Sequence, residues 1–235
     1  MKTDTKTGPE RGMLRIPEQA GTMFSDIRYA SVNGVTVAYK EAYPFGLPLL
    51  LINGFASPMD TWNPPVLAAL ARHFRVIVFD NRGTGYSTAS VEPFSIPLFA
   101  KDAVVLMDAL GIARANVLGL SMGASIAQEL VLAHPDRVER LVLVAGTCGG
   151  IELVRMRPET WERLTDNSGT AVELADRMFS VLFTKNWLAH MTRGSTAPTC
   201  MRRPALRMQP GRRRRSFYGR ARTTGCRRSG ARRSL

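Results

Sequence analysis

The stretch that decides the fold is ANVLGLSMGASIAQELV, from Ala115 to Val131. Its first six residues, ANVLGL, are mostly apolar and are typical of a short buried strand. After Ser121, apolar side chains recur at helical spacing, at Ile126 and Leu130 among others. The stretch therefore predicts a strand that runs directly into a helix, with Ser121 at the junction.

The junction has the pattern Gly-x-Ser-x-Gly, because Gly119 and Gly123 lie two residues before and two residues after Ser121. A serine on a sharp strand-to-helix turn needs neighbours with almost no side chain, and both glycines meet that need. The helix that starts there would direct free N–H groups and its positive dipole end at the reacting centre. The pattern predicts a nucleophilic serine suited to acyl transfer.

Strand-like and helix-like segments alternate around this junction. Asn33-Gly34 is a strong hairpin signal between the first two strands. Strands are expected at Phe24 to Val32, Val35 to Glu41, Leu47 to Ile52, Val76 to Phe79 and Val138 to Val144, and helices at Thr61 to Arg72, around Ile96 to Leu110, from the junction to about His134, at Arg157 to Leu164 and at Ala171 to Phe183. The alternation implies right-handed crossovers and a mostly parallel sheet, which is an α/β fold. Cys148 is expected in the core at the end of a strand.

Three motifs in a fixed order carry a family resemblance. Asn53-Gly54 follows one strand, DNRGTGYS at residues 80–87 follows the next, and the Gly-x-Ser-x-Gly junction comes third. In this order and spacing the chain resembles the α/β-hydrolase family, over roughly Phe24 to Leu188. The resemblance implies a mostly parallel sheet with flanking helices, and the beginning of a helical cap after Cys148. Plain packing helices are the alternative interpretation of that last region.

The resemblance also implies roles for individual residues. Ser121 would attack an acyl carbonyl, and the backbone N–H groups of Phe55 and Met122 would bind the resulting oxyanion. Supporting positions are Asn53, Gly54, Gly119 and Gly123. Many relatives carry His where this chain has Asn53, but Asn can hydrogen-bond its own loop, so we expect the oxyanion hole to survive. The loop at residues 80–87 would brace the rim of the site, and Asp80 is not expected to be the catalytic acid.

The family's catalytic acid and histidine are expected beyond the cap, but no acidic residue follows Asp176. The chain has three histidines. His73 and His134 are expected to be structural, and His190 comes too early in the chain to be the family's catalytic histidine. Residues 191–235 contain fourteen arginines, no lysine and no acidic residue, whereas the rest of the chain has 18 basic and 19 acidic residues. We therefore hypothesise that the chain is truncated or frameshifted near codons 185 to 195, so that the last sheet strands, the acid and the base are missing.

The domain prediction has four parts. Residues 1–23 form a flexible N-terminus, residues 24–148 the α/β-hydrolase core, residues 149–190 a partial helical cap, and residues 191–235 a basic, disordered tail. An exposed sheet edge is expected as a consequence, together with a tendency to aggregate.

The composition narrows the functional classes. No apolar run approaches the length of a membrane helix and the N-terminus lacks a signal-peptide core, so a soluble cytoplasmic protein is expected. Three scattered cysteines indicate neither a disulfide framework nor a zinc site, and no metal or cofactor is expected. The predicted function is hydrolysis of carboxylic esters or related small acyl compounds through Ser121, impaired without acid and base.

Two alternatives remain open: a non-catalytic α/β-hydrolase relative, and binding of anions or nucleic acid through the arginine-rich tail. The expected partner is a small-molecule acyl substrate, with no specific nucleic acid and no membrane. The sequence gives no indication of the oligomeric state.

Overall fold

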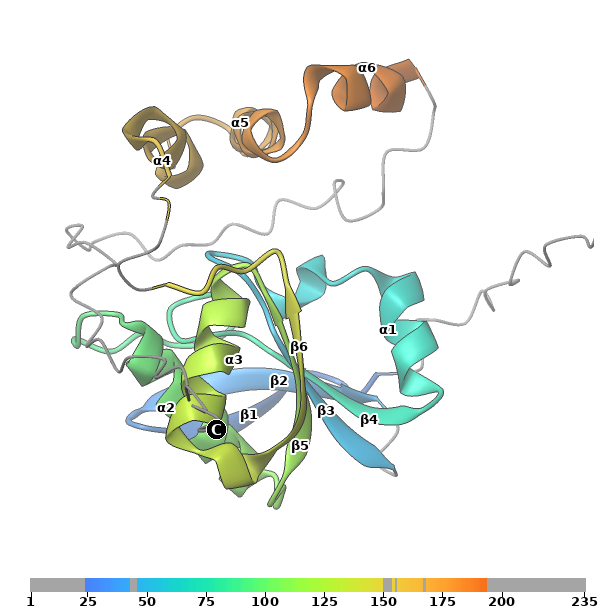
Figure 1. Ribbon diagram of the computed structural model, residues 1–235, viewed down its shortest axis with the longest axis vertical. Helices are drawn as coiled ribbons and strands as arrows, with labels where there is room; N and C mark the ends of the chain where they lie inside the picture. The colour runs from blue at the N-terminus through green and yellow to red at the C-terminus, as the bar shows by residue number, and fades with distance from the viewer. Residues whose placement is uncertain (1–23, 43–45, 150–153, 155, 167, 194–235) are drawn as a thin grey trace, which may run out of the picture.

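The computed structural model describes residues 24–42, 46–149, 154, 156–166 and 168–193, and a mixed sheet lies at its centre (Figure 1). The sheet has six strands in the order β1-β2-β4-β3-β5-β6. The strands are β1 (Arg28–Val32), β2 (Val35–Ala42), β3 (Leu47–Ile52), β4 (Phe74–Phe79), β5 (Ala115–Leu120) and β6 (Val138–Val144). The predicted flexible N-terminus and the predicted disordered tail beyond residue 193 lie outside the described residues.

The strand directions confirm the predicted mostly parallel sheet. β1 and β2 form an antiparallel hairpin whose turn residues, Asn33 and Gly34, have φ values of 43° and 74°. Both values are positive, as a tight two-residue hairpin turn requires. β2 also pairs antiparallel with β4, whereas β3 pairs parallel with both β4 and β5, and β5 pairs parallel with β6. The hairpin at Asn33-Gly34 is therefore the antiparallel start of a sheet whose remaining strands run in one direction.

Helices cover both faces of the sheet, which explains why its central strands are apolar throughout. In β3, Leu50 and Ile52 pack into the cluster under α2 and α3, while Leu49 and Leu51 pack into the cluster under α1. Alternate residues of a strand point to opposite faces, so a strand buried on both sides has no polar face. The covering helices are α1 (Pro64–Ala71), α2 (Ile96–Ala109) and α3 (Met122–Ala133), with short 3-10 turns η2 (Met59–Thr61) and η3 (Pro135–Arg137).

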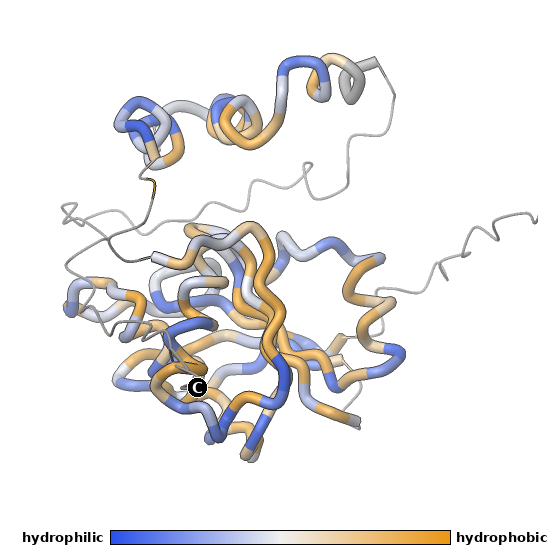
Figure 2. Tube along the Cα trace, viewed as in Figure 1, coloured by the Kyte–Doolittle hydropathy of each residue, from blue (hydrophilic) through white to orange (hydrophobic). Residues whose placement is uncertain are grey.

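A separate layer of three helices lies beyond the carboxyl ends of the parallel strands (Figure 1). It consists of α4 (Pro158–Thr165), α5 (Ala171–Leu182) and α6 (Lys185–Arg193). Figure 2 shows polar and apolar residues on different sides of these helices, with much of the apolar side of α4 and α5 turned toward the sheet. Stacked rings of Phe183 and Trp187, with centroids 4.1 Å apart, join α6 to the end of α5.

Helix α6 was not predicted, and it continues past residue 190, where the sequence analysis ended the cap. The sequence signal for its start is Thr184, whose hydroxyl accepts a hydrogen bond from the Trp187 N–H (3.3 Å). Threonine in this position is a common helix start. Helix α1 begins at Pro64 rather than Thr61 because Asn63, which precedes a proline, is extended with ψ 118°.

The prediction for Cys148 is wrong: this residue is exposed rather than buried at the end of a strand. Strand β6 ends at Val144, and the chain has left the sheet before it reaches Cys148. Among the helices of the described residues, none has the length and apolar character needed to cross a lipid bilayer.

Candidate active site

Ser121 occupies the sharp junction between β5 and α3 and has φ 56° and ψ −118°. A residue with a side chain rarely adopts positive φ, because its Cβ then crowds the backbone. Such strain persists only where the surrounding structure enforces it, and it is found most often at functional sites. The Ser121 side chain is exposed, so its hydroxyl is accessible above the carboxyl end of the sheet.

Close packing around the junction explains both flanking glycines. A Cβ added to Gly119 would lie 2.3 Å from the carbonyl oxygen of Gly123, and one added to Gly123 would lie 2.1 Å from the carbonyl oxygen of Ile52. No real Cβ comes so close to a backbone oxygen. A third glycine, Gly146, has the same role after β6, because its Cβ would lie 2.4 Å from that of Ala124. Gly146 is not among the predicted site residues, although a glycine just after an apolar strand is a usable sequence signal.

The loop after β3 lies directly against the junction. A Cβ added to Gly54 would be 3.2 Å from the Ser121 Cβ and 3.7 Å from its Oγ. Phe55 is the residue after Gly54 in this loop, and Met122 is the first residue of α3. The first N–H groups of a helix have no partner within the helix, and they carry the positive end of its dipole. The structure thus brings Ser121, Gly54 and the start of α3 together at one point.

Asn53 fastens this loop through its own side chain, which is buried. Its Oδ1 accepts a hydrogen bond from the Gly54 N–H (2.9 Å), and its Nδ2 donates to the Pro58 carbonyl (3.0 Å) and the Thr61 hydroxyl (2.8 Å). The carbonyl of Asn53 accepts a longer bond from Asn81 Nδ2 (3.4 Å). The amide therefore uses both its donor and acceptor atoms inside the loop and holds the chain around Gly54 in a fixed shape.

Asp80 joins the loops that follow β3 and β4. Its carboxylate accepts hydrogen bonds from the backbone N–H groups of Met59 (2.6 Å) and Tyr86 (2.8 Å). Burial raises the pKa of Asp80 above its ordinary value of 3.8, and the two N–H donors partly oppose that rise by stabilising the charged form. The carboxylate is committed to the backbone of two loops, in agreement with a bracing role.

Arg82 ties the loop after β4 to helix α2. Its Nε and Nη2 donate to the two carboxylate oxygens of Asp102, at 2.5 and 2.6 Å, and Nη1 donates to Ser90 Oγ at 2.8 Å. Asn33 Nδ2 donates to the same carboxylate at 2.9 Å. The side chains of Arg82 and Asp102 are 0% and 3% exposed, so the pair is sealed within the fold. This network fixes the loop from beneath and does not reach the Ser121 hydroxyl.

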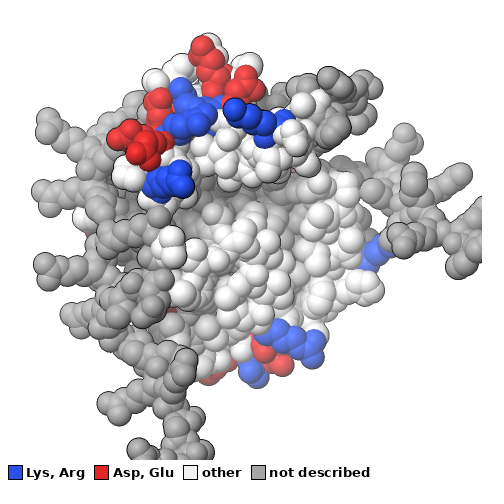
Figure 3. All heavy atoms as spheres, turned by 45° about the horizontal axis from the view of Figure 1, so that its top comes forward, with Lys and Arg blue, Asp and Glu red and all other residues white. Residues whose placement is uncertain are grey.

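The helical layer contributes an aromatic contact to the site. The ring of Trp161, on α4, lies 6.0 Å from the ring of Phe55, centroid to centroid, in a tilted arrangement. Phe55 follows Gly54, which packs against Ser121. The ring contact therefore links α4 to the loop beside Ser121. In Figure 3, charged side chains gather on the helical layer, while much of the described surface below it carries no charge.

The described histidines are not next to Ser121. His134 follows the far end of α3, and a twelve-residue helix separates the two by about 18 Å. His73 precedes β4, at the opposite end of the parallel strands from the Ser121 junction. His190 is on α6, and its side chain lies outside the described residues. Within the described part of the chain, no residue forms a hydrogen bond with the Ser121 hydroxyl.

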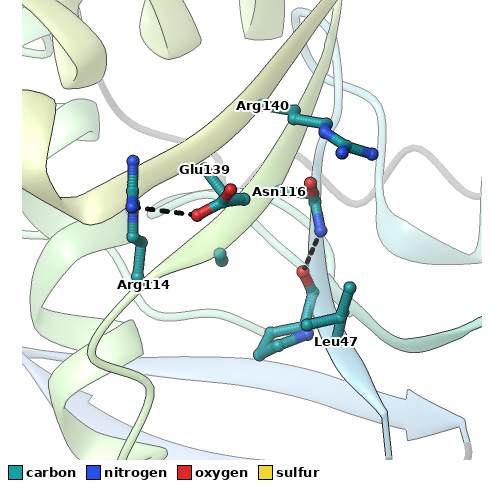
Figure 4. Close-up of a pocket in the computed structure, with 7 residues that line it drawn as sticks. Leu47, Arg114, Asn116, Glu139 and Arg140 are labelled. Carbon is teal, nitrogen blue, oxygen red and sulfur yellow. Dashed lines mark hydrogen bonds and ion pairs between the residues drawn. The ribbon is translucent and has the colours of Figure 1, made fainter.

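A surface cavity of about 330 Å³ lies elsewhere, at the amino ends of β3, β5 and β6 (Figure 4). Arg114 and Glu139 form an ion pair (3.0 Å) at its wall, and Asn116 Nδ2 donates to the Pro48 carbonyl (3.2 Å). The strands separate this cavity from Ser121, so it is not part of the same site. Across the described residues, no cluster of three or more His, Cys, Asp or Glu side chains could hold a metal ion.

Comparisons with known proteins agree with this architecture. The sequence model of the alpha/beta hydrolase fold matches residues 48–183, more than half of the chain. A putative carbamate hydrolase, RutD, from Azorhizobium caulinodans is 36% identical over 152 residues, which are 64% of this chain and 56% of that protein. A putative non-heme bromoperoxidase, BpoC, from Mycobacterium tuberculosis is 42% identical over 111 residues, 47% of this chain and 42% of that protein.

Among solved structures, the enol-lactonase from Burkholderia xenovorans LB400 has a TM-score of 0.60 and 31% identity, and the match covers 77% of this chain and 68% of the lactonase. An alpha/beta hydrolase fold protein from Chitinophaga pinensis has a TM-score of 0.57 and 27% identity, covering 65% of this chain and 54% of its own. The chain spans about half the length of the curated relatives it matches. The parallel sheet, the strand-to-helix junction at Ser121 and the matched region agree: the chain belongs to the α/β-hydrolase fold family.

Proposed function

We propose that this protein is a serine hydrolase of the acyl class, which acts on small carboxylic esters or related acyl compounds through Ser121. The observation that carries the proposal is the enforced positive φ of Ser121 at the start of α3, with the Gly54 loop packed against it. Two of the similar proteins, a putative carbamate hydrolase and an enol-lactonase, have names that describe chemistry at an acyl carbonyl, which supports the proposal.

The proposed reaction begins when Ser121 Oγ forms a bond to the acyl carbon. The carbonyl oxygen becomes an oxyanion, which accepts hydrogen bonds from the backbone N–H groups of Met122 and Phe55. Donors that are already fixed in place cost no reorganisation when the charge develops, which makes this kind of stabilisation effective. The bond from the acyl carbon to the alcohol oxygen then breaks, and the alcohol leaves with the proton that the Ser121 hydroxyl gave up. Water attacks the acyl-serine, which releases the carboxylic acid and returns a proton to Ser121 Oγ. No residue is assigned as the base or its acid partner.

The test is covalent labelling, because labelling depends on the nucleophile and does not require turnover. Serine hydrolases that lack a triad member retain roughly 10³-fold catalysis over water through the oxyanion hole and binding. The full chain is incubated with an alkyl fluorophosphonate and mapped by peptide mass spectrometry. We expect one adduct on Ser121, lost in Ser121→Ala and kept in Ser125→Ala, which changes a control serine in the first turns of α3.

A second candidate function, a non-catalytic family member that binds a ligand, is favoured by the absence of a hydrogen-bond partner for Ser121 Oγ among the described residues. The same experiment separates the two. A folded protein whose Ser121 is not labelled, even after long incubation, contradicts the hydrolase proposal and supports the binding role.

A further inference from the structure

Residues 54–57, in the loop after β3, form a tight turn. The Ser57 N–H donates a hydrogen bond to the Gly54 carbonyl (3.3 Å), which closes the turn over Phe55 and Ala56. Ala56 has φ 52°, whereas Phe55 is not among the described non-glycine residues with positive φ. Negative φ followed by positive φ at the two central positions is the pattern of a type II turn. The turn therefore requires Ala56 to hold a conformation that alanine rarely adopts.

The closing hydrogen bond also sets the direction of the Phe55 N–H. The Gly54 carbonyl and the Phe55 N–H belong to one planar trans peptide group, in which the two point in opposite directions. Because the carbonyl points into the turn, toward the Ser57 N–H, the Phe55 N–H points out of it. The Gly54 N–H is committed elsewhere in the loop, since it donates to the Asn53 side chain (2.9 Å).

Ser57 holds the second peptide group beside Phe55 as well. Its hydroxyl donates to the Phe55 carbonyl (3.2 Å), while its N–H donates to the Gly54 carbonyl. One residue therefore bonds both peptide groups that flank Phe55. These bonds lie in the loop beside the proposed nucleophile, because a Cβ added to Gly54 would be 3.2 Å from the Ser121 Cβ.

We propose that Ser57 is a positioning residue, which aims the Phe55 N–H at the oxyanion through these two hydrogen bonds, and that Ala56 supplies the positive φ that the turn requires. The inference rests on the proposed function, because it takes the Phe55 N–H as a donor to the oxyanion formed when Ser121 attacks. A donor that is fixed before the charge develops stabilises that charge most effectively. In this role Ser57 needs no contact with the acyl compound.

The loop has other supports, which separate this role from the stability of the loop as a whole. The Asn53 side chain donates to the Pro58 carbonyl (3.0 Å), and the Asp80 carboxylate accepts from the Met59 N–H (2.6 Å). These bonds hold the chain on both sides of the turn. Removal of the Ser57 hydroxyl should therefore leave the loop in place and loosen only the peptide groups next to Phe55.

The first test compares Ser57→Ala with Ser57→Thr in the full chain, by labelling with the alkyl fluorophosphonate. The phosphonyl oxygen takes the place of the oxyanion, and the rate at Ser121 is followed against probe concentration. We expect Ser57→Ala to lower the saturating rate constant about 3- to 10-fold, the effect of losing one hydrogen bond, without changing the half-saturating concentration. Ser57→Thr keeps a hydroxyl and should restore the wild-type rate. The matched control is Ser25→Ala, which also removes a hydroxyl bonded to a backbone carbonyl (2.9 Å) and should label as the wild type does.

The second test changes the backbone preference at position 56. Glycine adopts positive φ without strain, whereas a β-branched valine resists it. We expect Ala56→Gly to label at the wild-type rate. Ala56→Val should label at least about 10-fold more slowly, and the limit is the roughly 100-fold cost of losing one oxyanion donor. Circular dichroism shows whether each variant folds, and the Ser57 pair decides the question if Ala56→Val does not.

Several results overturn the inference while the proposed function stands. They are a wild-type chain labelled at Ser121 no faster than Ser57→Ala, a loss in Ser57→Ala that Ser57→Thr does not restore, and a loss confined to the half-saturating concentration. Equal slowing in Ala56→Gly and Ala56→Val overturns it as well. A wild-type chain that is not labelled at Ser121 instead contradicts the proposed function, and the inference then fails with it.

Discussion

Replacement of Arg82 by methionine is the perturbation with the largest effect on stability that the structure allows us to estimate. The guanidinium is fully buried and bonds both oxygens of Asp102, and it also donates to Ser90 Oγ. Methionine fills much of the same space but removes every one of these donors. The carboxylate of Asp102 then stays in the interior with only the Asn33 amide as a neutral partner.

The expected loss is about 3–5 kcal/mol in the free energy of unfolding, the usual result of breaking a buried ion pair by removing one partner. Most of this cost comes from the unpaired buried charge, not from the lost attraction. For a chain of this size, 1 kcal/mol shifts the melting temperature by about 2–4 °C, so we expect a decrease of roughly 6–20 °C.

Urea unfolding followed by circular dichroism measures the effect, with Arg114→Met as the matched control. Arg114 also pairs with a carboxylate, that of Glu139, but these side chains are 53% and 45% exposed. Surface pairs contribute only about 0–1 kcal/mol, so the control should unfold almost as the wild type does. The double variant Arg82→Met with Asp102→Leu should recover part of the stability, because it removes the stranded charge. The reasoning is refuted if Arg82→Met loses no more stability than Arg114→Met.

Two further predictions concern Asp80, in the loop after β4, and Trp161, on α4. The pKa of Asp80 is higher in the folded protein than in the unfolded chain, so the folded state binds the proton of this carboxyl more tightly. The free energy of unfolding therefore increases as the pH falls through the raised pKa toward 3.8. Urea midpoints measured from neutral pH down to the ordinary value of 3.8 should therefore shift in favour of the wild type over Asp80→Asn as the pH falls, and a difference that stays constant over that whole range contradicts this. Trp161→Ala removes the aromatic contact with Phe55. We expect this change to slow labelling by an aryl phosphonate about 2- to 10-fold more than labelling by a methyl phosphonate, because that factor corresponds to the free energy of one aromatic pair. Trp187→Ala, which alters α6 instead, should slow both probes alike, and an equal slowing by Trp161→Ala would count against a role for Trp161 in acyl selection.

Much of the core could be predicted because its signals are local. The Asn33-Gly34 turn requires positive φ at both positions, and few other dipeptides supply it. The uninterrupted apolar run of β3 is typical only of a strand covered on both faces. The pattern around Ser121 requires two residues without side chains, so the junction could be located to the residue.

The sequence by itself therefore determined the succession of strands and helices along the chain up to α5, and the position of the strand-to-helix junction, because hydrophobic period and turn chemistry act over a few residues. Only the tertiary structure decided which distant residues meet. It placed Gly54 beside Ser121, sealed Arg82 against Asp102, brought Trp161 of α4 to Phe55 and left Cys148 exposed. These outcomes depend on how crossovers and layers pack, and no local window of sequence contains that information.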